Sequence, residues 1–209
     1  MRISVAIIAK NEEAMIQGCI ESVLDADEIV LVDTGSEDNT KALAIKAGAT
    51  RVCTDFTWCD DFAAARNHAI SKCTGDWILS IDADDRLTEG GMKKIRKAIR
   101  EHPEDRAFHI LFMAEKGGST HKLPYIYKNS KEVFFKGAAH NYLSVTAAHD
   151  SGATMIYGYS PSHKKDPGRT FRILYKAVMA DRKKPREVFY LSREYQYKKD
   201  WISCLYWSE

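Results

Sequence analysis

Uninterrupted apolar runs alternate with helical stripes of apolar residues over the first 82 positions of this chain of 209 residues. Residues 3–9 form the first run, without the polar alternation of a half-exposed strand. Such runs are typical of strands that are covered on both faces in a parallel sheet. Because parallel strands are usually joined through a helix, the alternation predicts an α/β fold with a right-handed βαβαβαβ half-sheet.

The expected elements of this half are strands at 3–9, 28–32, 50–53 and 77–81, with helices that contain Ile16 and Cys19, begin near Asn39, and begin near Asp61. Beyond residue 85 we expect a helix that is capped by Thr88 and ends at His102-Pro103. Short β-rich runs then predict a mixed, partly antiparallel extension of the sheet, at 108–114, 123–127, 133–135, 142–145 and 154–157.

The last 41 residues are expected to be helical from Arg169, with a segment that starts at Pro185 and a final piece that is capped by Asp200. We therefore predict two units, residues 1–165 and a helical extension over 166–209. The final helix is still amphipathic at Glu209, which favours either a truncated chain or a helical hairpin that is covered by a further protein partner.

Composition excludes several functions. Lys and Arg total 31 against 29 for Asp and Glu, so net charge gives no argument for stable binding to nucleic acid or an anionic membrane. The five cysteines lack Cys-x-x-Cys spacing, which indicates reduced packing residues and not a zinc site. The apolar amino terminus is too short for a signal peptide or a membrane span, so we expect a soluble, cytoplasmic protein with no transmembrane segment.

Three carboxylates in four positions, Asp82-Ala83-Asp84-Asp85, directly follow the apolar run at 77–81. Clustered carboxylates at a buried strand end repel one another, and a divalent cation among the oxygens relieves that repulsion. Open α/β sheets bind ligands outside the carboxyl ends of their strands. The pattern predicts a metal site there, although a solvated acidic turn before a helix has the same composition.

Other polar clusters are expected at the same edge of the sheet. Asp33-Thr34-Gly35-Ser36 follows the second strand, and Lys10-Asn11-Glu12-Glu13 follows the first. Asp33 can accept a hydrogen bond from a base or ribose, while Ser36 with Asp38 and Asn39 is expected to cap the next helix. Arg66, one turn into the third helix, can reach a base edge or a phosphate. Together these clusters favour a nucleotide site, though each alone is also compatible with a capped turn or a surface residue.

Four segments of this sequence resemble family 2 glycosyltransferases with the GT-A fold, in both order and spacing. They are residues 9–13 (AKNEE), 27–40 (DEIVLVDTGSEDNT), 60–67 (DDFAAARN) and 75–85 (GDWILSIDADD). The resemblance is dense to about residue 90 and patchy to about residue 175. It implies a GT-A sheet and an inverting hexosyl transfer from a nucleotide diphosphate sugar, usually a UDP-sugar, with bound Mn²⁺ or Mg²⁺.

The resemblance also implies roles for individual residues. Asp84 would ligate the metal, with Asp82 facing the ribose or the metal and His163 as a further candidate ligand. The donor-binding set is Ala9, Asn11, Glu12, Asp33, Ser36, Arg66, Asp82 and Ala83. Lys164 and Lys165 complete it from a basic loop that would close over the diphosphate, although a solvated helix start has the same composition. The helices after residue 185 resemble a first, incomplete tetratricopeptide-type unit; packing of their aromatic residues against the catalytic domain is the alternative.

The acceptor side departs from the family pattern. Where members of this branch have His-Glu, this chain has His140-Asn141, and an Asn side chain cannot act as a base. His140 and Asp150 are then the candidate catalytic bases. The acceptor stays open among a glycan, lipopolysaccharide, a protein and a modified nucleobase.

Two other functions remain compatible with the sequence. A nucleotidyltransferase would use similar carboxylates, but such enzymes usually carry a Gly-rich basic loop after the first strand, and Lys10-Asn11-Glu12-Glu13 is acidic and has no glycine. A catalytically degenerate module that binds a nucleotide sugar and holds a partner through its helices is motivated by Asn141.

Overall fold

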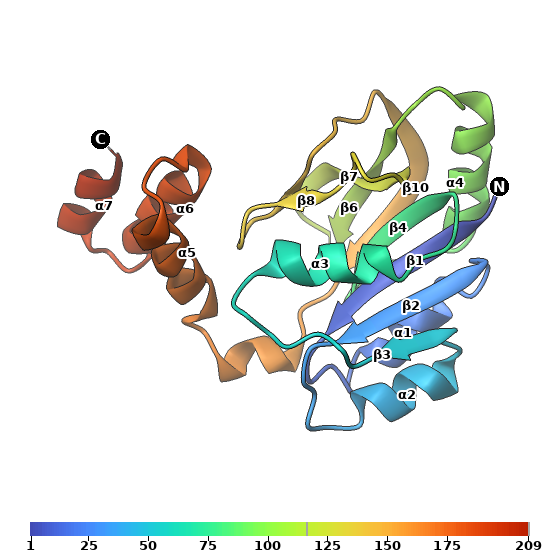
Figure 1. The fold of residues 1–209 in the computed structure, drawn as a ribbon, viewed down its shortest axis with the longest axis horizontal. Helices are drawn as coiled ribbons and strands as arrows, with labels where there is room; N and C mark the ends of the chain where they lie inside the picture. Colours follow the sequence, from blue (N-terminus) through green and yellow to red (C-terminus); the bar gives the residue numbers. More distant parts are fainter. Residues whose placement is uncertain (116, 209) are drawn as a thin grey trace.

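The computed structural model of the chain describes residues 1–115 and 117–208, with every side chain in these ranges except those of residues 163 and 165. Within them, eight strands form one curled mixed sheet in the order β3-β2-β1-β4-β7-β6-β10-β5 (Figure 1). A separate hairpin pairs β8 with β9. The strands are β1 (Ile3–Ala9), β2 (Glu28–Asp33), β3 (Arg51–Cys53), β4 (Trp77–Asp82), β5 (Arg86–Leu87), β6 (Ala107–Ala114), β7 (Thr120–Lys128), β8 (Phe135–Lys136), β9 (Tyr142–Leu143) and β10 (His149–Tyr157).

Helices cover both the sheet and its carboxyl-end edge. Helix α3 contacts β1 and β2 as it crosses the sheet, α1 packs against α2, and α4 packs against β10. The C-terminal helices α5 to α7 stand together at one end of the molecule (Figure 1). The helices are α1 (Ile16–Glu21), α2 (Thr40–Ala47), α3 (Phe62–Ser71), α4 (Gly91–Glu101), the 3₁₀ helix η1 (Pro161–Lys165), α5 (Arg169–Ala180), α6 (Pro185–Tyr197) and α7 (Trp201–Ser208).

The parallel half of the sheet confirms the predicted βαβαβαβ unit. Strands β3, β2, β1 and β4 are neighbours in that order, and all their pairings are parallel. The register sets Ala9 beside Asp33 and Ile8 beside Asp82. The loops that follow β1, β2 and β4 therefore leave the sheet at the same edge.

The rest of the sheet is mixed, as expected. Strand β7 is antiparallel to both β4 and β6, while β10 runs parallel to β6. Two details differ from the sequence prediction. The β8–β9 hairpin does not join the main sheet, and α4 begins at Gly91 without a cap from Thr88, because Thr88 instead bonds the carbonyl of Thr154 through both its amide and its hydroxyl.

Two apolar cores hold these elements together. The larger lies between the sheet and the helices around it, with fully buried residues such as Ile7, Leu79 and Phe108. A smaller core joins α5 and α6 to Ala139 in the loop between β8 and β9, and its fully buried members are Leu174, Val178 and Leu191. The second core fixes the predicted C-terminal helices against the first unit. No helix among the described residues has the length and apolarity that crossing a bilayer requires.

Candidate active site

A cavity of about 890 Å³ opens at the edge of the sheet where β1, β2 and β4 end. Its walls come from the loops after these strands, from α3 and β7, from the loop between β8 and β9, and from η1, α5 and α6. The lining residues are Ile8, Ala9, Lys10, Asn11, Glu12, Thr34, Trp58, Asp60, Phe62, Arg66, Asp82, Ala83, Asp84, His121, Leu123, Tyr125, His140, Asn141, Ser162, Asp166, Arg169, Arg172, Arg186 and Tyr190.

The acidic segment after β4 is divided between the cavity and the interior. Asp82 and Asp84 line the cavity, whereas Asp85 is buried behind it and accepts a hydrogen bond of 3.1 Å from the Gly158 amide. Burial, together with the charges of Asp82 and Asp84, raises the pKa of Asp85 to about 8. The raised pKa shows that the negative charges of Asp82 and Asp84 and the burial of Asp85 together disfavour a third charge in this segment.

Residues 158–160 pack directly onto this acidic segment. The Ser160 amide donates a 3.1 Å hydrogen bond to Asp84 Oδ2. A Cβ atom at Gly158 would lie 2.0 Å from the Asp84 carbonyl oxygen, so this close approach of two backbones requires glycine. The segment after β10 thus fixes the position of the Asp84 carboxylate.

Arg66 brings a buried cation to the same cavity. Asp61 caps α3 by accepting a 2.9 Å bond from the Ala64 amide, which starts the helix one turn before Arg66. The Arg66 guanidinium lies 5.5 Å from the Tyr125 ring centroid and donates to Asp82. Its Nε atom is buried and has no hydrogen-bond partner among the described residues. Buried N–H groups are normally bonded, so this atom is an exception at the wall of the cavity.

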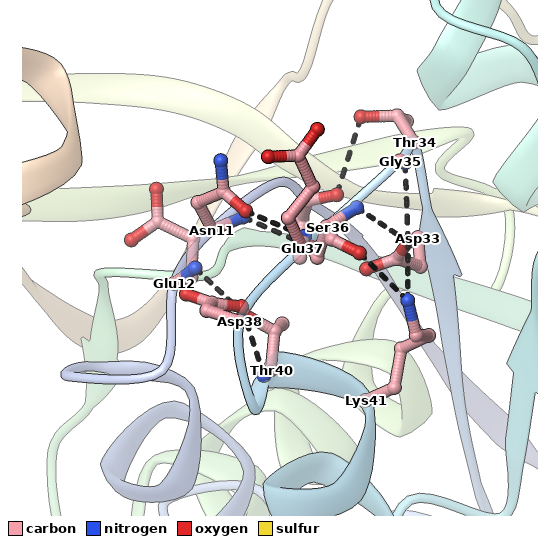
Figure 2. A network of polar contacts seen from close by, with 11 residues as sticks. Asn11, Glu12, Asp33, Thr34, Gly35, Ser36, Glu37, Asp38, Thr40 and Lys41 are labelled. Carbon is pink, nitrogen blue, oxygen red and sulfur yellow. Dashed lines mark hydrogen bonds and ion pairs between the residues drawn. The ribbon is translucent and has the colours of Figure 1, made fainter. Parts of the chain in front are cut away.

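Hydrogen bonds lock the loop after β1 to the loop after β2 (Figure 2). The Asn11 amide donates to the Ser36 hydroxyl at 2.9 Å, and the Glu12 amide donates to Thr40 Oγ1 at 2.7 Å. Of the three residues predicted to cap the following helix, Asp38 bonds the Thr40 amide at 3.0 Å. Asn39 makes no side-chain cap bond, and Ser36 bridges the two loops instead. This bracing holds Ala9, Asn11 and Glu12 at the cavity, where the sequence predicted them.

Asp33 lies below the surface of the cavity. Its Oδ1 atom accepts bonds from the Gly35 and Ser36 amides at 3.1 and 2.9 Å, and Lys41 Nζ lies 3.8 Å from it. The residue is 2% exposed, and its Oδ2 atom has no hydrogen-bond partner within the described part of the chain. Thr34, the next residue, lines the cavity. A second buried polar atom without a partner thus lies next to the cavity.

Asp82 and Asp84 fit a site for a divalent ion whose remaining ligands come from a substrate and from water. No three His, Cys, Asp or Glu side chains converge as a closed metal site among the residues that the structure describes. Mg²⁺ at phosphate-handling sites is usually held by only one or two carboxylates plus phosphates and waters. Asp82 and Asp84 meet that requirement, and a cation would offset the repulsion between them, which adds to burial in raising the pKa of Asp85. The side chain of His163, the third predicted ligand, lies outside the described residues.

The cavity is also lined by His140, Asn141 and several residues that sequence reasoning did not assign. Trp58 and Phe62 pack edge to face at 4.9 Å, and Trp58 Nε1 donates to Asp60 at 3.0 Å. Arg186 and Tyr190 reach the cavity from α6. Residues 58–62 overlap the DDFAAARN segment, which is a usable signal; no local pattern marks positions 186 and 190 as part of a site.

Asp150 and Lys164, like Asp33 and Ser36, are predicted site residues that do not line the cavity. Asp150 is paired with Lys122 Nζ at 2.5 Å, and alternation along β7 sends Lys122 to the face opposite that of His121 and Leu123, which line the cavity. Lys164 is exposed in η1 outside the lining, and the side chain of Lys165 is not among those described. Arg169 and Arg172, two basic residues in the first turn of α5, do line the cavity.

Comparisons with known proteins agree with this arrangement. A TPR repeat-containing protein of Synechococcus elongatus is 37% identical over 142 residues, which cover 66% of this chain and 34% of that protein. The lipopolysaccharide core biosynthesis glycosyltransferase LpsC of Rhizobium meliloti is 39% identical over 102 residues, or 47% of this chain and 34% of LpsC. This chain thus spans about a third of the length of these relatives.

Among solved structures, S. aureus TarS 1–349 aligns with a TM-score of 0.59 at 18% identity, over 96% of this chain and 73% of TarS 1–349. That likeness shows the shared GT-A fold. The profile of "Glycosyl transferase family 2" matches residues 4–164. Because this match covers more than half of the sequence, the chain belongs to glycosyl transferase family 2.

Proposed function

We propose that this chain transfers a hexose from a nucleotide diphosphate sugar to an acceptor hydroxyl with the help of a divalent metal ion, and that a UDP-sugar is the donor. One observation carries the proposal: two carboxylates, Asp82 and Asp84, and the buried guanidinium of Arg66 converge on one cavity. Family membership supports the reaction class. S. aureus TarS, which shares the fold, has been crystallised with UDP and with UDP-GlcNAc.

The nucleoside end of the donor would lie between the loops after β1 and β2. Ala9, Asn11 and Glu12 line this part of the cavity. Asp33 Oδ2 and Arg66 Nε are buried and have no hydrogen-bond partner within the described ranges; the first is an acceptor and the second a donor. Uracil and ribose each offer both kinds of group, so a bound nucleoside would complete these bonds.

The diphosphate would lie against the acidic segment after β4. Asp82 and Asp84 would hold Mn²⁺ or Mg²⁺ there, and such an ion stabilises a leaving diphosphate as a Lewis acid. Arg169 and Arg172 line the same cavity and add positive charge for the phosphates. We propose that η1, with Lys164, closes over the donor and excludes water, which would otherwise hydrolyse it.

His140 is the proposed proton acceptor for the incoming hydroxyl. Its side chain lines the cavity, and its ring nitrogens make no hydrogen bond to any described residue. Burial and the charges of Arg186 and Arg193 lower the pKa of His140, which favours the neutral imidazole that can take a proton. Attack on the face opposite the departing diphosphate would invert the anomeric carbon. Residues 1–165 would form this catalytic unit and 166–209 its helical extension.

Release of nucleoside diphosphate tests the proposal. The protein is incubated with Mn²⁺ and a panel of nucleotide sugars, and UDP binding is measured in parallel by calorimetry with Mn²⁺ or with EDTA. We expect metal-dependent release and binding in the wild type and loss of both in Asp84→Asn. Asp25→Asn, an exposed carboxylate outside the cavity, is the matched control and should behave as wild type.

The other outcomes separate the rival functions. Release of pyrophosphate in place of nucleoside diphosphate would indicate a nucleotidyltransferase. Tight metal-dependent binding without any turnover would indicate a binding module, as Asn141 in place of the family's Glu suggests. Equal activity of Asp84→Asn and wild type contradicts the proposed metal site.

A further inference from the structure

His140 has an unusual backbone for a residue in the wall of a cavity. Its φ is +48°, in the left-handed region that non-glycine residues adopt only sparsely. Such conformations persist where surrounding contacts determine them, often at functional sites. The contacts that fix His140 come from helix α6 in the C-terminal segment.

Helix α6 holds both the side chain and the main chain of His140. The Tyr190 ring stacks on the imidazole with centroids 4.0 Å apart and planes 15° apart. Arg186 donates from Nε and Nη2 to the His140 carbonyl oxygen, at 3.2 and 3.0 Å. The Arg186 guanidinium is itself placed between two rings, 4.6 Å from the Tyr142 centroid and 5.0 Å from that of Tyr190.

The smaller core joins α6 to the loop that carries His140. Leu191, next to Tyr190, is fully buried against α5, and Ala139, next to His140, is 3% exposed in the same core. The Phe62 amide, at the start of α3, bonds the Ala138 carbonyl at 2.9 Å. The loop that carries His140 is therefore held between α3 on one side and α6 on the other.

From this geometry we infer that Arg186 and Tyr190 are positioning residues for His140, so that α6 forms part of the active site and the C-terminal segment is more than a platform for partners. The inference rests on the proposed function, because it assigns these residues to the acceptor side of that reaction. Both residues line the cavity together with His140.

The charged and titratable groups around His140 support the same role. Arg186, Tyr190 and Arg193 face it from α6, and Tyr142 lies beyond Arg186 on β9. Glu187, also on α6, lies beside Gly137. Burial, then Arg186 and then Arg193, lower the pKa of His140, so removal of either cation raises that pKa.

Substitutions at Tyr190 test the stack with two readouts, the NMR spectrum, which requires no activity, and the kinetics of nucleoside diphosphate release. In Tyr190→Phe, we expect the upfield-shifted His140 ring protons in the NMR spectrum to stay in place and the rate of nucleoside diphosphate release to stay within about twofold. In Tyr190→Leu, we expect the upfield shift to disappear and kcat to fall at least about tenfold with little change in the KM for the donor. Tyr175→Leu, an exposed ring on α5 that is 43% accessible and lies outside the cavity lining, controls for folding and should match wild type.

Removal of the Arg186 or the Arg193 charge distinguishes the positioning of His140 from the electrostatic effect on its pKa. Both Arg186→Gln and Arg193→Gln should move the acidic limb of the kcat against pH profile to higher pH. Only Arg186→Gln should also lower the maximal kcat that is reached at higher pH, because Arg186, unlike Arg193, bonds the His140 carbonyl. An active Tyr190→Leu with unchanged kcat, or equal plateaus in the two Arg variants, overturns the inference. If the wild type releases no nucleoside diphosphate, that result contradicts the proposed function instead.

Discussion

Arg66 of α3 donates a 2.5 Å hydrogen bond to the carboxylate of Asp82 at the end of β4. The side chain of Arg66 is 8% exposed and that of Asp82 is 40% exposed, so the pair joins the interior to the cavity. The guanidinium also contacts Tyr125 and Phe135, 5.5 and 5.4 Å from their ring centroids, and these two rings pack edge to face at 6.0 Å. A buried cation against two mutually perpendicular rings thus fixes one wall of the proposed donor site.

Arg66→Lys retains the charge but loses the planar group and its fork of donors. We expect unfolding free energy to fall by about 1–3 kcal/mol, less than for a fully buried pair because Asp82 is partly exposed. UDP binding with Mn²⁺ should weaken about tenfold. Urea unfolding and calorimetry measure the two effects. Arg106→Lys, in the exposed pair with Glu132, is the control and should change stability by less than about 0.5 kcal/mol. Equal stability losses in both variants would contradict the assignment.

Gly158→Ala is expected to disturb the acidic segment directly. The new Cβ would lie 2.0 Å from the Asp84 carbonyl oxygen, so one backbone must move. Overpacking of this kind costs about 1–3 kcal/mol or more, and we expect metal-dependent UDP binding to be lost with it. Gly168→Ala is the matched control, because a Cβ there meets no atom within 4 Å and φ is −91°. If Gly158→Ala binds UDP as wild type does, the packing of residues 158–160 is not needed to position Asp84.

The parallel half of the fold and the polar clusters at its carboxyl-end edge could be predicted because short stretches of sequence determine both. Buried parallel strands show as continuous apolar runs, and polar residues directly after them must lie at one edge of the sheet. Asn11, Glu12, Asp82 and Asp84 are brought to one cavity for that reason. The C-terminal helices were also predictable, from Pro185 and from Asp200, which bonds the Ser203 amide at 3.1 Å.

The acceptor side was not predictable in the same way, because tertiary contacts decide it. Arg186 resembles a linker residue in sequence, and the packing of α6 against α5 in the smaller core brings it to His140. Asp150 has the right chemistry for a base, but the pleat of β7 directs its partner Lys122 away from the cavity. Thr88 has the right chemistry for a cap, but a strand pairing with β10 uses its backbone instead.

Acid should destabilise the protein in part through Glu28. Burial would raise the pKa of this carboxyl, but bonds from Ser4 Oγ and from Thr74 outweigh it and lower the pKa below its ordinary value of 4.5. A pKa that is depressed in the folded state contributes stability above the unfolded value, and this contribution is lost as the pH falls through the folded value. We therefore expect Glu28→Gln to be less stable than wild type at pH 7, with a difference that shrinks below pH 4.5. Urea unfolding at several pH values measures this. Glu101→Gln, an exposed residue on α4, should show no such trend.

A buried hydrogen bond between Ser80 and Tyr127 should show non-additive energetics. Their oxygens lie 2.6 Å apart, in neighbouring strands β4 and β7, and both residues are at most 1% exposed. Either single change, Ser80→Ala or Tyr127→Phe, leaves one buried hydroxyl without a partner and should cost about 1–3 kcal/mol. The double variant removes both hydroxyls, so its loss should be smaller than the sum of the single losses by about 0.5–3 kcal/mol. A thermodynamic cycle from urea unfolding measures that difference. Strict additivity would mean that water replaces each missing partner, and hence that this part of the β4–β7 interface is wet.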